Sequence, residues 1–249
     1  MTRLASDNPH RTLPLRLSPA ARWQALNRDI ASCEKCPRLR THCQSIARIK
    51  RAAFRDDTYW ARPVPNLGPH TARLLILGLA PAAHGANRTG RLFTGDRSGD
   101  FLFAAMHATG FANQPTSIHA ADGLTLIDCA ITGAAHCAPP DNKPTRDELA
   151  ACAPFLDQTL ALMPHLRLIL CLGKIAFDTA LALYKRHDWL PAKPPRPKFA
   201  HAALHKFSPA PALLCSYHPS QQNTFTGKLT QPMLQQIFNT ARAFIDRSP

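Results

Sequence analysis

The residues between Gly78 and Asp96 have the types and spacing of a loop that binds a polar ligand. The stretch follows the apolar run Leu74–Leu77 and precedes a helical pattern that begins near Ser98, so it leaves the end of a strand. Four glycines within it let the backbone approach a ligand closely. Between them lie donors, an acceptor and an aromatic face, supplied by His84, Asn87, Arg88, Arg91, Phe93 and Asp96. Such a set indicates a binding site.

Two more polar segments, 133–143 and 218–228, follow the ends of apolar runs. His218 could donate a hydrogen bond to an oxygen that gains charge, and Asp96 could position or deprotonate a water molecule. Asn142 is a second candidate for holding that water. Each residue also has a structural alternative: a structural histidine, the cap of the helix that follows Asp96, and a plain turn residue at Asn142.

Four cysteines could hold a metal centre: Cys33 and Cys36 in an N-terminal turn, Cys137 in the second polar segment, and Cys152 in a predicted helix. Four thiolates can bind zinc or an iron–sulfur cluster, and spacing alone does not separate the two. Cys43 could replace one ligand. The centre would tie the N-terminal part to the helical layer. The remaining cysteines fall in predicted buried strands and are interpreted as small core residues: Cys129, Cys171 and Cys215.

The composition favours a polyanionic partner and a reducing compartment. The chain has 30 basic and 16 acidic residues, a formal charge of +14, which indicates nucleic acid; a solvated cationic surface is the alternative. Eight cysteines without a signal peptide predict an intracellular, cytoplasmic protein. The apolar runs are too short to span a membrane, and we expect a soluble monomer.

Alternating strand and helix patterns predict the fold. Four apolar, β-rich runs are expected as strands: 73–78, 124–132, 166–172 and 212–217. Each is followed by a helix that is expected to start near Ser98, Thr145, Lys174 and Thr230, respectively. This alternation implies parallel pairing and right-handed crossovers, hence an α/β protein: a three-layer α/β/α sandwich around a four-stranded parallel sheet.

The regions outside this core are predicted more loosely. Residues 1–30 are expected as an N-terminal arm and a first helix running from Ser18 toward Cys33, and residues 31–249 as the α/β domain. Residues 44–70 carry several prolines and are interpreted as an irregular excursion. A basic, proline-rich loop within 184–210 suits contact with a phosphate backbone, with a solvated linker as an equal alternative.

Strand direction brings the polar segments together. In a parallel sheet the carboxyl ends of the strands lie along one edge, where open α/β sheets bind their ligands. The segments that follow Leu77, Ile131, Leu172 and Tyr217 therefore become neighbours. The sequence thus predicts a site built from the Gly78–Asp96 loop and the two polar segments.

Three motifs resemble those of family 5 uracil-DNA glycosylases: 78–96, 138–144 and 218–224. The likeness covers roughly residues 30–245. It implies a base-excision repair enzyme that binds uracil-containing DNA, flips the base out and hydrolyses its N-glycosidic bond. Related iron–sulfur glycosylases keep their cluster ligands at the positions of four cysteines here, so the resemblance favours a structural 4Fe-4S cluster over zinc: Cys33, Cys36, Cys137 and Cys152.

The resemblance also implies roles at the site. Asp96, His218 and Asn142 would be catalytic. The flipped base would stack on Phe93 in a pocket formed by Gly78, Ala80, Ala82, His84, Gly85, Phe93 and Gly133. Arg88 and Arg91 would meet phosphates, unless either pairs with Asp96. A polar tip would enter the DNA groove and fill the vacated stack: Ser220, Gln221, Gln222 and Asn223.

Two departures from the related family 4 enzymes bear on substrate range. Those enzymes carry an acid directly after the first glycine, where this chain has Leu79, as in family 5. They also carry an Asn near the end of the second strand that reads the pyrimidine edge, where this chain has Thr132 and Gly133. Losing that amide should loosen selectivity, so other deaminated bases such as hypoxanthine are expected substrates. The competing hypothesis is a non-catalytic iron–sulfur DNA-binding protein of the same fold.

Overall fold

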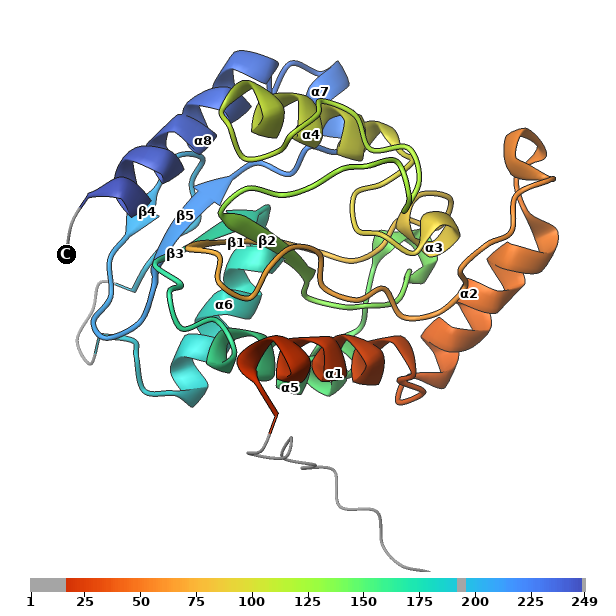
Figure 1. Cartoon of the computed structure of the whole chain (residues 1–249), viewed down its shortest axis with the longest axis horizontal. Helices are drawn as coiled ribbons and strands as arrows, with labels where there is room; N and C mark the ends of the chain where they lie inside the picture. Colours follow the sequence, from red (N-terminus) through yellow and green to blue (C-terminus); the bar gives the residue numbers. More distant parts are fainter. Residues whose placement is uncertain (1–16, 192–195, 248–249) are drawn as a thin grey trace, which may run out of the picture.

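A five-stranded sheet forms the centre of the molecule (Figure 1), in a computed structural model that describes residues 17–191 and 196–247. Its strand order is β2-β1-β3-β5-β4. Four strands are parallel: β1 Leu74–Gly78, β2 Cys129–Gly133, β3 Leu168–Leu172 and β5 Ala212–Ser216. The short β4, Leu204–His205, pairs antiparallel with β5. The prediction of four parallel strands is thus correct for the core and missed an edge strand too short to show periodicity.

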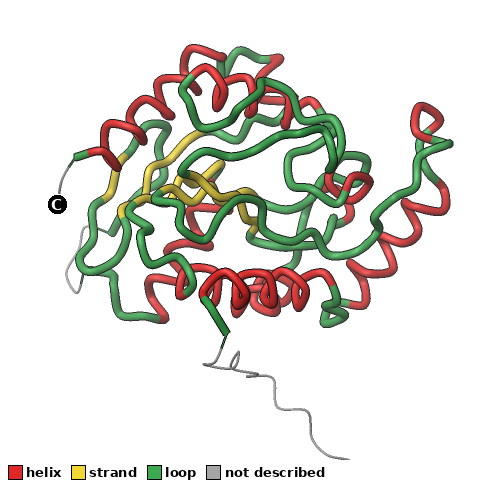
Figure 2. The backbone as a smooth tube through the Cα atoms, in the orientation of Figure 1, coloured by secondary structure: helices red, strands yellow, loops and turns green. Residues whose placement is uncertain are grey.

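Helices cover both faces of the sheet, which confirms the three-layer α/β/α architecture (Figures 1 and 2). On one face lie α4, Arg97–Ala108, and α8, Gln231–Asp246. On the other face lie α1, α5 and α6, which span Pro19–Ala31, Arg146–Ala161 and Lys174–Arg186. All five residues of each parallel strand are buried, as expected of strands covered on both sides.

Alternation along β1 shows how one strand serves both cores. Leu74 and Ile76 belong to the apolar cluster under α4 and α8. Leu75 and Leu77 belong to the cluster under α1, α5 and α6. Successive side chains point to opposite faces of a strand, so a run of large apolar residues suits a sheet covered on both sides.

Side-chain caps fix the starts of the helices close to their predicted positions. Thr145 Oγ1 accepts a hydrogen bond from the Glu148 N–H at 3.2 Å, and Glu148 accepts one from the Thr145 N–H at 2.7 Å, which completes the predicted capping box. Thr230 and Ser18 cap α8 and α1 in the same way through single hydroxyls.

The second strand begins later than its apolar pattern predicts. Residues from 124 were expected in it, but β2 starts at Cys129. Asp128 has a left-handed backbone with φ of 55°, which interrupts an extended chain before the strand. Its carboxylate accepts from the Arg73 N–H at 3.0 Å and from Arg73 Nε at 2.8 Å. The upstream residues make only an isolated bridge, between Ala112 and Leu126.

The N-terminal region is more ordered than its composition indicates. The described part of the predicted arm and first helix is α1, whose Trp23, Leu26 and Ile30 join the core; residues 1–16 lie outside the described residues. A further helix, α2, spans Pro37–Ile49 and overlaps the stretch interpreted as irregular. Four short helical segments in loops complete the described helices: η1 Ala52–Phe54, α3 Ala86–Thr89, η2 Pro140–Asn142 and α7 Gln221–Phe225. In the described ranges, no helix is both long and apolar enough to cross a membrane.

Candidate active site

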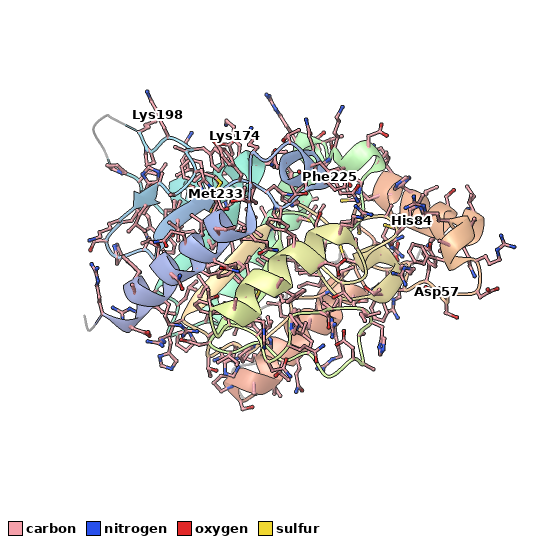
Figure 3. The ribbon with its side chains drawn as sticks, turned by 90° about the horizontal axis from the view of Figure 1, so that it is seen from above. Asp57, His84, Lys174, Lys198, Phe225 and Met233 are labelled. Atoms are coloured by element: carbon pink, nitrogen blue, oxygen red, sulfur yellow. The ribbon has the colours of Figure 1, made fainter. Side chains whose placement is uncertain are left out.

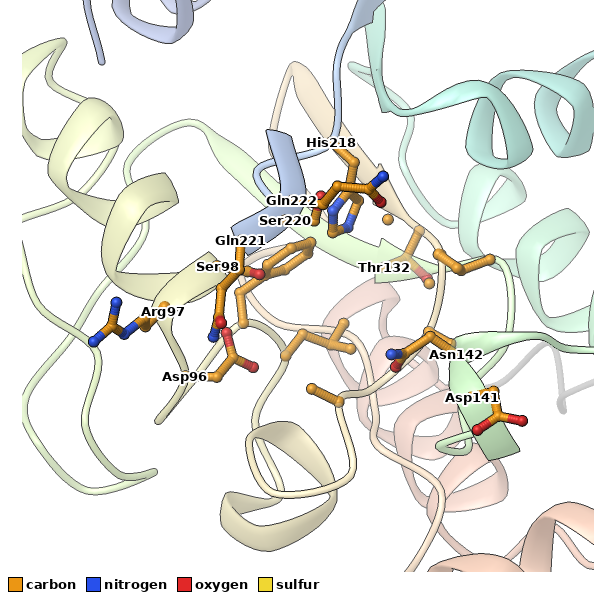
Figure 4. Close-up of a pocket in the computed structure, with 17 residues that line it drawn as sticks. Asp96, Arg97, Ser98, Thr132, Asp141, Asn142, His218, Ser220, Gln221 and Gln222 are labelled. Carbon is orange, nitrogen blue, oxygen red and sulfur yellow. The ribbon is translucent and has the colours of Figure 1, made fainter. Parts of the chain in front are cut away.

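A cavity of about 660 Å³ opens at the carboxyl edge of β1 and β2 (Figure 4). The loop after β2 is joined to the opening loop by two backbone hydrogen bonds, from Ala134 N–H to Gly78 O at 3.0 Å and from Ala135 N–H to Leu79 O at 2.9 Å. Eleven of the predicted site residues line this cavity: Gly78, Ala80, Ala82, Phe93, Asp96, Gly133, Asn142, His218, Ser220, Gln221 and Gln222. A cavity therefore lies where strand direction predicted the site.

Phe93 is clamped against the end of β1. A Cβ on Gly78 would come within 2.9 Å of two ring carbons, so only glycine lets the ring lie here. Phe93 itself has a φ of 53°, a conformation unusual for a bulky residue. Its ring centroid lies 6.0 Å from that of His218 with the planes tilted by 33°. The ring is thus a fixed wall of the cavity next to the histidine.

Asp96 caps α4 and lines the cavity at the same time. Its Oδ1 accepts a hydrogen bond from the Gly99 N–H at 2.9 Å. Gly85 packs so closely that a Cβ there would collide with the carboxylate. Burial raises the pKa of Asp96, while the N–H groups of Gly99 and Ser98 act in the opposite direction. The structural and catalytic interpretations of Asp96 are therefore compatible.

His218 follows β5 and is held by its neighbours. The Asn223 side-chain amide donates to His218 O at 2.9 Å, and Ser220 caps α7 just beyond. Gly173, with a φ of +93°, leaves 3.3 Å between a would-be Cβ and the His218 side chain. Burial lowers the pKa of His218 to about 4, so the imidazole is neutral near pH 7. Asn223 does not line this cavity; its amide holds the loop, and its place at the polar tip stays a prediction.

A second cavity of about 860 Å³ adjoins the first. Both share five lining residues: Ala82, Asp96, Arg97, Asn142 and Gln221. His84 and Gly85 were predicted in the base pocket, but they line this second cavity. His84 Nδ1 lies 3.0 Å from the Tyr59 hydroxyl. Arg51 and Arg97, both exposed, line its wall as cations that the sequence analysis did not single out.

Arg91 has no access to a phosphate, which contradicts its predicted role. The side chain is 7 % exposed and pairs with Asp122 at 2.6 Å and with the Ser117 hydroxyl at 2.7 Å. The guanidinium helps to hold the pKa of Asp122 well below its usual range, although burial acts against it. Arg91 therefore fixes the opening loop to residues 117–122. The sequence could not show this, because the partner lies 31 residues away.

Arg88 is also largely committed to protein partners. It pairs with Asp57 at 2.6 Å, donates to Gly95 O at 3.0 Å and lies 3.9 Å over the Phe54 ring. Neither arginine pairs with Asp96, the alternative considered from sequence. Arg88 still borders the second cavity, and its contact with a phosphate stays a prediction.

The basic loop before β4 lies apart from the second cavity. Lys198 and His84 lie far apart in Figure 3, and β4 is at the sheet edge opposite β2. Lys198 O is held by His205 Nε2 at 3.0 Å. Residues 192–195 of the loop lie outside the described residues. The described part therefore favours the linker interpretation over a phosphate contact beside the site.

Several cavity residues were not predicted: Leu79, Leu92, Arg97, Ser98, Thr132 and Asp141. Most of them are direct sequence neighbours of predicted site residues, and this adjacency is the signal that could have identified them. Thr132 differs, since its side chain is fully buried and its register with Leu77 of β1 turns it toward the layer under α1, α5 and α6, so it borders the cavity only from the end of β2.

Three of the four predicted cluster cysteines lie at helix ends or in a loop, and the fourth lies within a helix. Cys33 follows α1, Cys36 precedes α2, Cys137 follows β2, and Cys152 lies in α5. Burial raises the pKa of Cys152 to about 11, and the charges of Cys36 and Cys33 add to it. Burial and Cys33 likewise raise the pKa of Cys36. These mutual effects place the thiols within electrostatic reach of each other.

Ion pairing fixes the elements that carry these thiols. Arg38 of α2 binds Glu148 of α5 through two bonds of 2.7 and 2.8 Å. All eight cysteines are free thiols. Within 17–191 and 196–247, no three His, Cys, Asp or Glu side chains are close enough to hold one metal ion. An iron–sulfur cluster is a larger body than one ion, so its thiolates stand farther apart.

Comparison with known proteins identifies the family. The model of the "Uracil DNA glycosylase superfamily" matches residues 65–242. The chain is 49% identical over 218 residues to a "Type-5 uracil-DNA glycosylase" of Mycobacterium tuberculosis, which covers 87% of this chain and 80% of that protein. This chain belongs to the uracil-DNA glycosylase superfamily. A type-5 relative from Thermus thermophilus is 43% identical, with 88% of this chain and 96% of the relative covered.

Within the superfamily the chain is closer to type-5 than to type-4 relatives. A "Type-4 uracil-DNA glycosylase" of Pyrobaculum aerophilum is 28% identical over 66% of either chain. The difference agrees with Leu79 and with Thr132-Gly133, the two places at which the chain departs from the family 4 pattern. The resemblance to family 5 is confirmed.

Proposed function

We propose that this chain hydrolyses the N-glycosidic bond between uracil and deoxyribose in DNA and leaves an abasic site. The observation that carries the proposal is the convergence of an aromatic wall, a neutral imidazole and a half-buried carboxylate on one cavity: Phe93, His218 and Asp96. Its volume of about 660 Å³ is in the range of small-molecule sites and suits a nucleotide turned out of the duplex.

His218 stabilises the departing base. Breaking the bond leaves negative charge on the base, and a neutral imidazole can donate a hydrogen bond to the oxygen that receives it. The low pKa of His218, about 4, supports this role because the ring is present in its neutral form. Phe93 stacks on the base beside it, since the two rings lie 6.0 Å apart.

Asp96 acts on the sugar side. A carboxylate there can position the attacking water and stabilise the positive charge that builds on the sugar. Its hydrogen bond from Gly99 engages Oδ1 and fixes the side chain. Asn142 is exposed at the rim of the same cavity and is the second candidate for holding the water.

The sugar–phosphate backbone of the DNA strand follows the second cavity. Arg51 and Arg97 are exposed on its wall and supply charge for phosphates. Gln221 and Gln222 are exposed on α7 between the cavities and the solvent, where they can fill the space that the flipped base leaves. The formal charge of +14 agrees with a DNA substrate.

A 4Fe-4S cluster bound by Cys33, Cys36, Cys137 and Cys152 fits the donor set. Four thiols from separate elements share one electrostatic neighbourhood and form no disulfides. The cluster would crosslink α1, α2 and α5. Freshly purified protein should show broad visible absorption and about four irons per chain. Stoichiometric zinc in a colourless sample would contradict the cluster.

A base-release assay tests the function. Duplexes bearing uracil, hypoxanthine, xanthine or a thymine mismatch are incubated with monomeric protein, and strand cleavage is scored with and without alkali. We expect release of uracil and of other deaminated bases, with cleavage only after alkali, as for a hydrolase without lyase chemistry. Tight binding without release would favour the alternative, a non-catalytic iron–sulfur DNA-binding protein.

A further inference from the structure

A groove of about 570 Å³ lies at the amino ends of β3 and β5 and is called here the amino-edge groove. Its apolar lining comes from the residue before β3, the segment before β5 and the last turns of α8: Leu166, Phe207, Pro209, Pro211 and Phe244. Phe207 and Phe244 are only half-buried, and each packs on a different one of the two apolar cores. The groove therefore leaves apolar surface open where the two helical layers meet.

Three cations also line the groove: Arg167, Lys206 and Arg247. Arg167 donates to Ile245 O at 2.7 Å, which holds its guanidinium against the end of α8. Lys206 and Arg247 are exposed, and Lys206 belongs to the basic stretch 184–210 that the active site does not use. Within 17–191 and 196–247, none of the three forms an ion pair with an acidic side chain, and no Asp or Glu lines the groove. Apolar surface and positive charge thus occur together.

The groove and the active site lie at opposite ends of the strands. The groove is lined by residues that precede β3 and begin β5, whereas His218 follows the end of β5. Each of these five-residue strands spans about 15 Å. Figure 1 shows the end of α8 near β4 and far from α3, which borders the second cavity. Asp246, next to Arg247 in sequence, is held by Arg73 beside β1. DNA in the active site would therefore leave the groove open.

We propose that the amino-edge groove docks an acidic peptide segment of a partner protein, with an aromatic or branched apolar side chain as its anchor. The proposal does not depend on the glycosylase function. The anchor would cover Phe207 and Phe244, and flanking acidic residues would meet Arg167, Lys206 and Arg247. A volume of about 570 Å³ suits one large side chain and the backbone that carries it rather than a folded domain.

Charge disfavours the occupants that this chain could itself supply. Residues 1–16 carry one acid, Asp7, and three arginines, Arg3, Arg11 and Arg16. A second copy of the chain brings the same formal charge of +14, and like charges oppose association. DNA would satisfy the cations through its phosphates but would leave the apolar lining in contact with water. An acidic peptide with an apolar anchor matches both properties of the groove.

Fluorescence anisotropy tests the proposal with the full chain and a labelled peptide of about twelve residues, in which aspartates flank a Phe-Leu pair. Binding should weaken about tenfold when asparagines replace the aspartates, and about as much when serines replace the Phe-Leu pair, since charge and anchor both contribute. The double variant Lys206→Glu with Arg247→Glu should also bind the peptide about tenfold more weakly, because attraction at the rim becomes repulsion. An unchanged thermal midpoint would confirm that this variant is folded.

Arg28→Glu with Arg48→Glu is the matched control. It changes the net charge by the same amount, at exposed arginines of α1 and α2 that do not line the groove. Its affinity for the peptide should stay within about twofold of that of the unaltered chain, because exposed charges outside the groove are largely screened by salt. Saturating uracil-free duplex DNA should not displace the peptide.

Three results would overturn the proposal. Absence of saturable peptide binding, or an equal loss of affinity in the two double variants, would show that the groove is not a specific site. Binding that persists without the Phe-Leu pair would reduce the interaction to charge attraction alone. Displacement of the peptide by duplex DNA would assign the cations to nucleic acid. None of these results bears on base release, so failure of the docking proposal is distinct from failure of the proposed function.

Discussion

The polar groups at the two ends of the central strands differ in whether they are paired with other protein groups. At the amino edge, Arg73 binds both Asp128 and Asp246, and Arg242 reaches Asp128 at 3.4 Å. At the carboxyl edge, the Thr132 hydroxyl has no partner and the burial of His218 lowers its pKa. Paired charges at one edge stabilise the fold, whereas Asp96 and His218 at the other edge line a cavity. The same sheet thus separates stability from chemistry.

The largest expected effect is at Asp96. Asp96→Asn keeps a side chain that can cap α4 but removes the charge that acts on sugar and water, so single-turnover uracil release should fall about 10²- to 10⁴-fold. The thermal midpoint should change little. Release at the normal rate would remove Asp96 from the chemistry and leave it as a helix cap.

His218→Ala should reduce release about 10²- to 10³-fold, the usual cost of losing one donor to a developing negative charge. Binding of uracil-containing duplex should persist. The matched control is His187→Ala, which removes an exposed histidine paired with Asp157 at 2.8 Å on the far end of α6. Equal rates of uracil release for His218→Ala and His187→Ala would show that catalysis at the carboxyl edge depends on groups other than His218.

The pH profile should sharpen the assignment of Asp96. Burial raises the pKa of Asp96 above its ordinary value, and the carboxylate is the active form. Activity should therefore fall about tenfold per pH unit below that raised pKa. His218, with a pKa of about 4, stays neutral from pH 5 to 8 and adds no further change there. An acid limb that persists in Asp96→Asn would assign it to another group.

The smallest expected effect is at the amino edge. Asp128→Asn keeps the acceptor for the Arg73 N–H and tolerates the left-handed backbone, but removes the charge that pairs with Arg73 and Arg242. These arginines are partly exposed, so the loss should be about 1 kcal/mol, or 2–4 °C in thermal midpoint. Base release should be unchanged. Slower base release by Asp128→Asn with an unchanged thermal midpoint would show that the amino edge also contributes to catalysis.

Predictability also differed between regions. The core strands and the helix starts followed from apolar runs and local caps, which are signals carried by neighbouring residues. Gly78, Phe93 and Asp96 could be placed together because they share one loop. Arg91 was misassigned because its partner Asp122 belongs to a different segment, and proximity in sequence carries no record of such a pairing.

The sequence by itself determined the α/β class, the edge at which the site lies and the family, because strand direction and contiguous motifs are local properties. Only the tertiary structure decided which groups are left without partners. The hydroxyl of Thr132 and the carboxylate of Asp128 lie near the two ends of β2. Both are polar groups, and residue type alone does not show which of them gains hydrogen-bond partners. Packing surrounded the Asp128 carboxylate with arginines and buried the Thr132 hydroxyl without a partner, because hydrogen-bond satisfaction depends on what the whole chain brings near each atom.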